Sequence, residues 1–242
     1  MNLEKVNSNS SIKDLDQEAL LSGFYEKIYS LKKHDSPDES RTSLVQRIKK
    51  LINEGEIFPN RVLDIGSGPQ ALEKQLLSRS QGGDSIRRGT SQFISVDLAK
   101  IMPVKLLSGK TKNVNHVQGN AINLPFKDKT FGLVVSNLAI DFCPQEEAFR
   151  EAHRVLSDGG KGIFYLHHPS MLRRFPKDEE IRIFWQYLKD NSVLFSSEEE
   201  IKTFLEKVGF APLEISLKSE KENLFLNNRE KETWWEVMVE KI

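Results

Sequence analysis

The sequence predicts an α/β fold built on a doubly wound parallel sheet, and three observations carry that prediction. Five short apolar runs, each typical of a buried strand, alternate with helical patterns between residues 62 and 166. Several of these runs end in a glycine or an acid, as strands do at the ligand-binding edge of an open sheet. The length of 242 residues suits one such domain with some elaboration.

Charge balance and cysteine content restrict the class of protein. Thirty-five basic residues balance thirty-five acidic ones, so no global field attracts nucleic acid or an acidic membrane. The single Cys143 excludes an internal disulfide framework and fits a reducing compartment. Residues 1–20 are polar and acidic, unlike a secretory signal, and no stretch approaches a membrane-spanning length. We therefore expect a cytoplasmic protein.

Two helices are predicted ahead of the sheet. Residues 1–15 form a polar arm, and 16–31 then carry a short amphipathic pattern. The pattern is clearer from Asp38 to Asn53. Its apolar stripe consists of Leu44, Val45, Ile48, Leu51 and Ile52. We expect an arm and helices over residues 1–55 that pack on a core domain of residues 56–242.

The predicted sheet begins with the run Val-Leu-Asp-Ile at 62–65, which stops at a tight turn containing Gly66 and Gly68. A helical pattern follows from Ala71, and a turn-rich loop at 81–92 separates it from the next strand. The remaining parallel strands are expected at 93–97, 114–117, 131–136 and 162–166.

Three further helices are predicted in the second half of the chain. The first covers 148–156 and is expected to close on the Asp-Gly-Gly turn at 158–160. The second covers 181–188, and a capping box at 197–200 opens the third. The last two strands are expected at 213–217 and 235–239, and a polar loop at 219–229 is expected to connect them.

The acid in the first strand is its unusual feature. Asp64 lies among apolar neighbours, and a charge at the rim of an apolar strand needs a partner. The glycine turn that follows lets the backbone lie against a ligand at the carboxyl edge of the sheet. A cationic amine on that ligand would be one such partner.

Five segments, in order and at suitable spacing from about residue 60 onward, resemble class I S-adenosylmethionine-dependent methyltransferases. They are Val-Leu-Asp-Ile-Gly-Ser-Gly-Pro at 62–69, Ser-Val-Asp-Leu at 95–98, Gly-Asn-Ala-Ile-Asn-Leu-Pro-Phe at 119–126, Phe-Gly-Leu-Val-Val-Ser at 131–136 and Glu-Ala-His-Arg-Val-Leu-Ser-Asp-Gly-Gly at 151–160. The resemblance implies a Rossmann-like, seven-stranded sheet with an antiparallel last strand. It also implies S-adenosyl-L-methionine as cofactor and methyl transfer as the reaction.

The same resemblance assigns the cofactor residues. It implies Asp64 near the methionine amine, Gly66 and Gly68 against the cofactor, and Asp97 on both ribose hydroxyls. The adenine position, usually Asp in this family, is Asn120 here, whose carbonyl can accept a hydrogen bond from the adenine amine. The other expected cofactor-binding residues are Ser67, Leu98, Ala121, Ser136 and Asn137.

A dinucleotide site is the competing interpretation, because Gly66, Gly68 and Ala71 formally fit that fingerprint. An acid two residues before the first glycine has no role beside a pyrophosphate. Pro69 also removes a backbone N–H where phosphate would want donors. Asp97 lies beyond the roughly 20-residue spacing expected for the ribose acid, although the long preceding loop could explain the excess.

Three residues are candidates for a base on the acceptor side: Asp141 after the fourth strand, and His167 and His168 after the fifth. An amine or hydroxyl acceptor can need a base, whereas a carboxylate does not. Asp141 could instead cap the helix beside Pro144, and the histidines could anchor their loop. Adjacent strand residues point to opposite faces, so at most one histidine should face the pocket. The same geometry disfavours a shared metal site, and we expect no metal.

The segment after the fourth strand bears on the acceptor. Residues 136–142 lack the Asn/Asp-Pro-Pro-aromatic signature of many enzymes that methylate exocyclic amines of nucleobases or the glutamine amide. With Cys143 they are similar to malonyl carrier-protein carboxyl methyltransferases. We expect a small molecule or carrier-bound acid as acceptor, without nucleic acid or membrane, and a lid at 171–189. An RNA or protein methyltransferase and a non-catalytic binding protein of the same fold are the alternatives, and the oligomeric state stays open.

Overall fold

The computed structural model describes residues 22–23, 39–57, 60–69, 71–77, 92–99, 114–170, 193–219 and 233–242. Several predicted segments lie wholly or mostly outside those residues. They are the helices at 16–31 and 181–188, the loops at 81–92 and 219–229, and the lid at 171–189.

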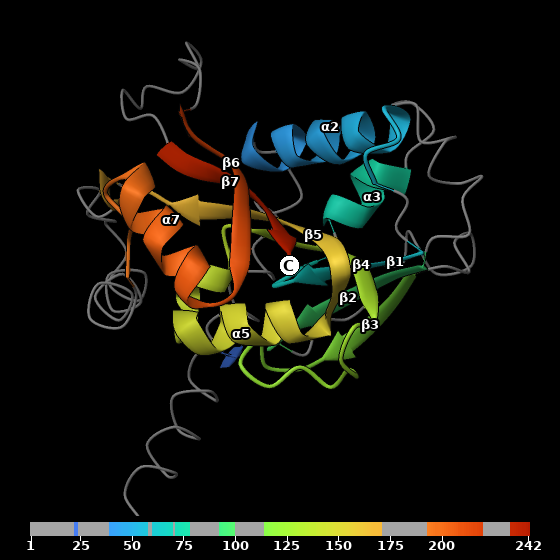
Figure 1. The fold of residues 1–242 in the computed structure, drawn as a ribbon. Helices are drawn as coiled ribbons and strands as arrows, with labels where there is room; N and C mark the ends of the chain where they lie inside the picture. Colours follow the sequence, from blue (N-terminus) through green and yellow to red (C-terminus); the bar gives the residue numbers. More distant parts are fainter. Residues whose placement is uncertain are drawn as a thin grey trace, which may run out of the picture.

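A seven-stranded sheet with the strand order β3-β2-β1-β4-β5-β7-β6 forms the centre of the molecule (Figure 1). Its strands are β1 (Arg61–Ile65), β2 (Gln92–Asp97), β3 (Val114–Gln118), β4 (Phe131–Asn137), β5 (Leu156–His167), β6 (Phe210–Ser219) and β7 (Thr233–Lys241). The first five strands pair in parallel, whereas β7 is antiparallel to both of its neighbours, β5 and β6. The predicted doubly wound sheet with an antiparallel last strand is thus confirmed.

Helices cover both faces of this sheet (Figure 1). They are α2 (Glu39–Asn53) and α3 (Ala71–Leu77) on one face, and α5 (Gln145–Val155) and α7 (Glu198–Lys207) on the other. Successive side chains of a strand point to opposite faces, so each central strand contributes apolar side chains to two hydrophobic cores, one on each face of the sheet. Val62 packs with α2 and α3, while the adjacent Leu63 packs with α5 and α7.

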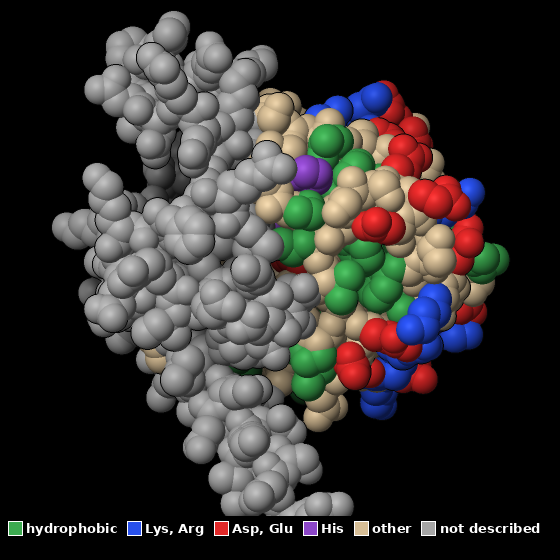
Figure 2. All heavy atoms as spheres, turned by 90° about the vertical axis from the view of Figure 1, so that its left-hand side faces the viewer, with side chains coloured by type: hydrophobic (Ala, Val, Ile, Leu, Met, Phe, Trp, Pro, Cys, Tyr) green, Lys and Arg blue, Asp and Glu red, His purple; other side chains and the backbone are tan. Residues whose placement is uncertain are grey.

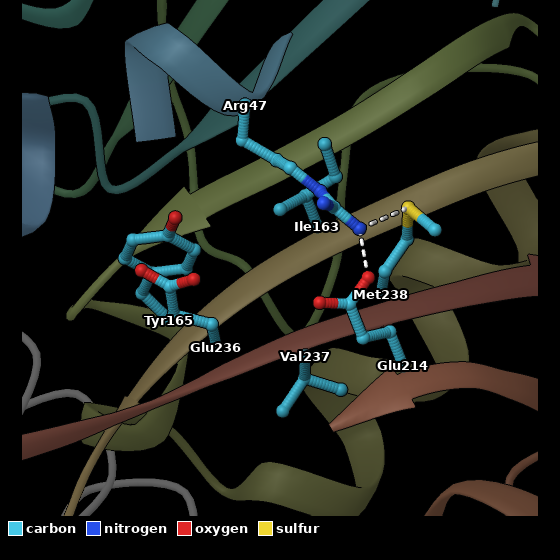
Figure 3. Close-up of a pocket in the computed structure, with 7 residues that line it drawn as sticks. All are labelled: Arg47, Ile163, Tyr165, Glu214, Glu236, Val237 and Met238. Atoms are coloured by element: carbon cyan, nitrogen blue, oxygen red, sulfur yellow. Dashed lines mark hydrogen bonds and ion pairs between the residues drawn. The ribbon is translucent and has the colours of Figure 1, made fainter. Parts of the chain in front are cut away.

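Apolar and polar contacts both fix α2 on the sheet. Its predicted stripe is buried against β4 and β5, and its first residue lies one position from the predicted start. Arg47 forms an ion pair with Glu214 of β6, and Ser43 Oγ donates to Glu236 Oε1 of β7 at 2.5 Å. The Tyr165 hydroxyl lies 3.1 Å from the same serine oxygen. All of these residues except Ser43 line a small hollow between α2 and three strands (Figure 3).

The prediction that Asp-Gly-Gly at 158–160 ends the helix before the fifth strand is wrong. The helix α5 ends at Val155, its C-cap Leu156 is already extended, and β5 begins there. Phe131 pairs with Leu156 but Leu133 pairs with Lys161, so 158–160 bulge out of the β4–β5 ladder. Glycine at a positive φ serves this bulge rather than a helix terminus.

The predicted capping box at the start of α7 is present. Ser197 Oγ accepts a hydrogen bond from the Glu200 N–H at 3.3 Å, and Glu200 Oε2 accepts one from the Ser196 N–H at 2.7 Å. Glu146 links this helix to α5 through an ion pair with Lys207. On the side of the molecule that carries α7, described acidic and basic side chains lie close together (Figure 2). No helix among the described residues has the length and apolar character needed to span a bilayer.

The last strand also closes the C-terminal end of α5. Lys241 is buried, and its Nζ donates to the carbonyls of His153 at 2.9 Å and Leu156 at 2.8 Å. Because helix-end carbonyls buried without donors are costly, Lys241→Met should lower the free energy of unfolding by about 1–3 kcal/mol. Urea denaturation measures this loss, and the exposed Lys202→Met is the matched control. Equal stability of the two variants would contradict the capping role.

Candidate active site

The turn after β1 requires glycine for two separate reasons. Gly66 and Gly68 have φ angles of 72° and 52°, in the left-handed region that side chains disfavour. A Cβ atom on Gly66 would lie 2.3 Å from the Cβ of Ala139, which follows β4. The turn therefore lies directly against the end of the neighbouring strand, at the carboxyl edge of the sheet.

Hydrogen bonds within the protein occupy the backbone donors of this turn. The N–H groups of Gly66 and Ser67 donate to the Val96 carbonyl at 2.8 and 3.2 Å. The Gly68 N–H donates to Asp97 Oδ2 at 2.9 Å, and Pro69 has no N–H. A pyrophosphate site needs such donors free at the loop. The geometry therefore opposes the dinucleotide interpretation more directly than the sequence does.

Asp97 ends β2 with its carboxylate held at both oxygens. Besides the bond from Gly68, its Oδ1 accepts a hydrogen bond from the Ala99 N–H at 2.9 Å. A carboxylate fixed in this way at the end of a strand is the kind of acceptor that a vicinal diol such as a ribose needs, and Leu98 follows directly at this edge.

The segment after β3 joins the same edge. The Gly119 N–H donates to the Asp97 carbonyl at 2.9 Å. Asn120 Oδ1 accepts a hydrogen bond from the Ile122 N–H at 3.2 Å and so holds the turn that contains buried Ala121. This places the Asn120 side-chain carbonyl, a hydrogen-bond acceptor, at the same edge of the sheet as the Asp97 carboxylate.

Ser136 serves as a link beneath the site. Its buried hydroxyl donates to the Ile65 carbonyl at 2.9 Å and accepts from the Ile140 N–H at 3.1 Å, so it ties the ends of β1 and β4 together. Two neighbouring polar atoms, Ser67 Oγ and Asn137 Oδ1, are buried without a hydrogen-bond partner among the described residues. Buried polar atoms of this kind ordinarily have a partner, so these two fit a site that accepts a polar ligand.

A second carboxyl group lies behind the turn, and it was not foreseen from the sequence. Glu73 of α3 is fully buried, and its Oε1 accepts a hydrogen bond from Ser95 Oγ at 2.6 Å. Burial, and then the negative charges of Glu73 and Asp97, raise the pKa of Asp64 well above its usual range. Burial also raises the pKa of Glu73. The only sequence signal was an acid inside a short apolar helix.

The structure brings two of the three base candidates into contact. After β4 the chain turns at Leu138, with φ 53°, into the short helix η3 (Ile140–Phe142). Asp141 Oδ2 then accepts hydrogen bonds from the His167 backbone N–H at 2.6 Å and pairs with His167 Nδ1 at 2.9 Å. The Phe142 ring packs on the imidazole at 4.8 Å between centroids. Asp141 does not cap α5, whose N-cap Pro144 has no side-chain hydrogen bond.

The Asp141–His167 pair has the arrangement of a general base. A carboxylate that accepts from Nδ1–H fixes the imidazole tautomer whose Nε2 carries the lone pair. The hydrogen bonds described for His167 involve its backbone N–H and Nδ1, which leaves Nε2 for another group. Both side chains are buried, at 7% and 1% exposure, so the pair is rigidly held.

His168 points away from this pair. Its Nδ1 lies 3.0 Å from Ser170 Oγ and accepts the Ser170 N–H at 3.2 Å, which anchors the turn after β5. Cys143 is half-buried beside the site, and desolvation followed by the charges of Asp141 and Asp97 raises its thiol pKa to about 12. A thiol with that pKa is not a nucleophile at neutral pH. Groups of three or more potential metal ligands are absent from the part of the chain that the structure describes.

Comparison with known sequences supports a single class of protein. A family model described as a methyltransferase domain matches residues 63–164. The malonyl-[acyl-carrier protein] O-methyltransferase of Geobacter sulfurreducens is 27% identical over 177 residues, which cover 71% of this chain. The ubiquinone/menaquinone biosynthesis C-methyltransferase of Legionella pneumophila is 29% identical over 173 residues, 62% of this chain. The chain spans 63% and 66% of the length of these two relatives.

The fold is shared more widely than the sequence. The 1,6-didemethyltoxoflavin-N1-methyltransferase of Burkholderia thailandensis, solved with S-adenosylhomocysteine, covers 100% of this chain, and the match covers 93% of that protein. The two share 12% sequence identity at a TM-score of 0.65. The matched domain model spans the glycine turn, both strand-end acids and β4. With the sheet topology and these relatives, it supports assigning the chain to the class I S-adenosylmethionine-dependent methyltransferases.

Proposed function

We propose that this protein transfers a methyl group from S-adenosyl-L-methionine to a small molecule or a carrier-bound acceptor. One observation carries the cofactor side of this proposal. The donors of the glycine turn are bonded to β2, while two backbone N–H groups hold the Asp97 carboxylate at the rim of the sheet. Such a rim suits a nucleoside diol and a cationic amino acid better than a pyrophosphate.

Each cofactor residue takes a defined part in this proposal. Asp97 would accept both ribose hydroxyls, Asn120 the adenine amine, and Asp64 would face the methionine ammonium. The glycine turn and the buried oxygens beside it would line the space between those points. These lining residues are Gly66, Ser67, Gly68, Leu98, Ala121, Ser136 and Asn137. The cofactor supplies the reactive methyl group, so the protein mainly aligns the acceptor and excludes water.

Asp141 and His167 define the acceptor side. His167 Nε2 would take the proton of the acceptor as the methyl group arrives, and Asp141 would stabilise the resulting imidazolium. A base is useful for a hydroxyl or an amine and unnecessary for a carboxylate, so the pair favours an acceptor that carries a proton. Two relatives are named as an O-methyltransferase of a malonyl carrier protein and a quinone C-methyltransferase, so carrier-bound and aromatic acceptors are both worth testing.

The cofactor assignment can be tested by thermal melting. S-adenosylhomocysteine should raise the melting temperature of the wild type, whereas NAD should not. Because charge-assisted hydrogen bonds contribute about 1.5–3 kcal/mol, Asp97→Ala should weaken S-adenosylhomocysteine by a factor of about 10–100. The exposed Asp158→Ala serves as the matched control. Stabilisation by NAD alone would overturn the proposal.

The acceptor can be identified with a labelled methyl group. Wild-type protein and labelled cofactor are added to cell extract, and the labelled product is separated into small-molecule, acyl-carrier, RNA and protein fractions. Label in the first two fractions supports the proposal. Label confined to RNA or protein would replace it with the corresponding alternative, and cofactor binding without any transfer would indicate a non-catalytic binding protein.

A further inference from the structure

Two carboxyl groups meet beneath the glycine turn. By alternation along β1, Asp64 points to the face covered by α2 and α3, and Glu73 reaches the same space from α3. Glu73 Oε2 is buried without a hydrogen-bond donor from the described residues, although the two carboxyls are in hydrogen-bonding contact. Two carboxylates cannot donate to each other, so this contact becomes a hydrogen bond only when one of them carries a proton.

The surroundings of the pair favour that proton. Desolvation and the mutual charge raise the pKa of Asp64, with Asp97 of β2 adding to the effect. Other contacts favour the ionised forms: hydrogen bonds with the Ser95 hydroxyl, a backbone N–H and Asp64 lower the pKa of Glu73, and the charge of Arg41 on α2 lowers the pKa of both carboxyls. The balance leaves both pKa values raised, and coupled carboxyls of this kind titrate as one unit.

We propose that Glu73 is a positioning residue that acts on the cofactor site through a shared proton. In the absence of ligand, the Asp64–Glu73 pair holds one proton between its carboxyls. When the ammonium group of the cofactor reaches Asp64, that proton passes to solvent and the ammonium takes over its role as counter-charge. The step breaks one carboxyl O–H bond, forms an ion pair, and releases one proton.

The inference rests on the proposed cofactor and adds a consequence that the cofactor assignment alone does not have. Binding that releases a proton strengthens as pH rises. Below the pKa of the pair, each pH unit should therefore cost about tenfold in affinity. The ammonium group of the ligand stays protonated over this acidic range, so the dependence belongs to the protein.

Glu73→Gln separates this role from a merely structural one. The glutamine carbonyl can accept the Ser95 hydrogen bond, and its amide can donate to Asp64, so Asp64 stays ionised without a shared proton. On the acidic side of the wild-type midpoint, the affinity of the wild type for S-adenosylhomocysteine should change about tenfold per pH unit, whereas that of the variant should change less than about threefold over the same range. Glu206→Gln, exposed on α7, is the matched control and should titrate as the wild type does.

Calorimetry with S-adenosylhomocysteine in two buffers of different ionisation enthalpy counts the protons. At a pH below the midpoint of the wild-type pH dependence, the wild type should release about one proton per ligand bound and Glu73→Gln close to none. A wild type that releases none, or a glutamine variant that keeps the full pH dependence, would overturn the inference. So would equal weakening of the variant at every pH, which is the result expected of a purely structural glutamate.

A second variant covers the case in which Glu73→Gln does not fold. Ser95→Ala removes the hydrogen bond that favours ionised Glu73, so the midpoint of the pH dependence should move upward. An unchanged or lowered midpoint would contradict the shared proton. Failure of S-adenosylhomocysteine to bind at any pH would instead overturn the cofactor assignment.

Discussion

Replacement of His167 by glutamine is expected to lower the rate of methyl transfer by a factor of about 10²–10⁴, the range that general acid–base catalysis supplies. The imidazole is the group that presents a lone pair at Nε2, and glutamine offers only an amide there. Affinity for S-adenosylhomocysteine should stay within about threefold of the wild type, because the cofactor residues lie on other strands. Single-turnover transfer to the acceptor identified from extract measures the first effect, and calorimetry measures the second.

Asp141→Asn tests the other residue of the Asp141–His167 pair. The asparagine carbonyl can still accept the two bonds that Asp141 Oδ2 accepts, but it lacks the negative charge that would stabilise the imidazolium formed during proton transfer. Its rate should fall together with that of the His167 variant, and the double variant should be little worse than either. His168→Ala is the control, since its ring anchors the turn at Ser170. A fall in rate for His168→Ala alone would move the base to the neighbouring residue.

Gly66→Ala should be the most damaging single methyl group in the cofactor site. The substitution forces alanine into a left-handed conformation and places its Cβ 2.3 Å from the Cβ of Ala139. The conformational cost is about 1–2 kcal/mol, and the overlap adds about 1–3 kcal/mol more. We expect a loss of about 2–5 kcal/mol in the free energy of unfolding and no detectable stabilisation by S-adenosylhomocysteine.

Gly159→Ala provides a matched control for this prediction. Gly159 has a φ of 67°, close to that of Gly66, but a Cβ there would meet nothing within 4 Å. Its variant should show the conformational cost alone, about 1–2 kcal/mol in urea denaturation. Ala139→Gly in the Gly66→Ala background should recover part of the loss by relieving the overlap. Equal losses for the two single alanine variants would show that the overlap relaxes freely.

The sheet could be predicted from sequence because its information is local. Strands buried on both faces must be apolar throughout, and the acids near their ends, Asp64 and Asp97, interrupt that pattern at the carboxyl edge of the sheet. The bulge in β5 could not be predicted in the same way. Its Asp-Gly-Gly sequence suits a helix terminus and a bulge equally, and only the register between β4 and β5 decides between them.

The sequence offers Asp141 and His167 as base candidates, but it does not predict that they contact each other. Asp141 and His167 lie 26 residues apart, and their contact depends on the left-handed turn at Leu138. No pattern in the sequence predicts that turn. Glu73 was missed because its role comes from tertiary burial. On a short helix an acid ordinarily faces solvent, and nothing in the sequence distinguishes this one.

The order of β5, β7 and β6 in the sheet has a consequence for synthesis on the ribosome. β6 pairs only with β7, although β7 is translated later. While β6 emerges, the edge of β5 that will receive β7 is still open, and β6 has no strand to join. The final part of the sheet therefore assembles in one late step, and the intermediate before it presents two unpaired edges to other nascent chains.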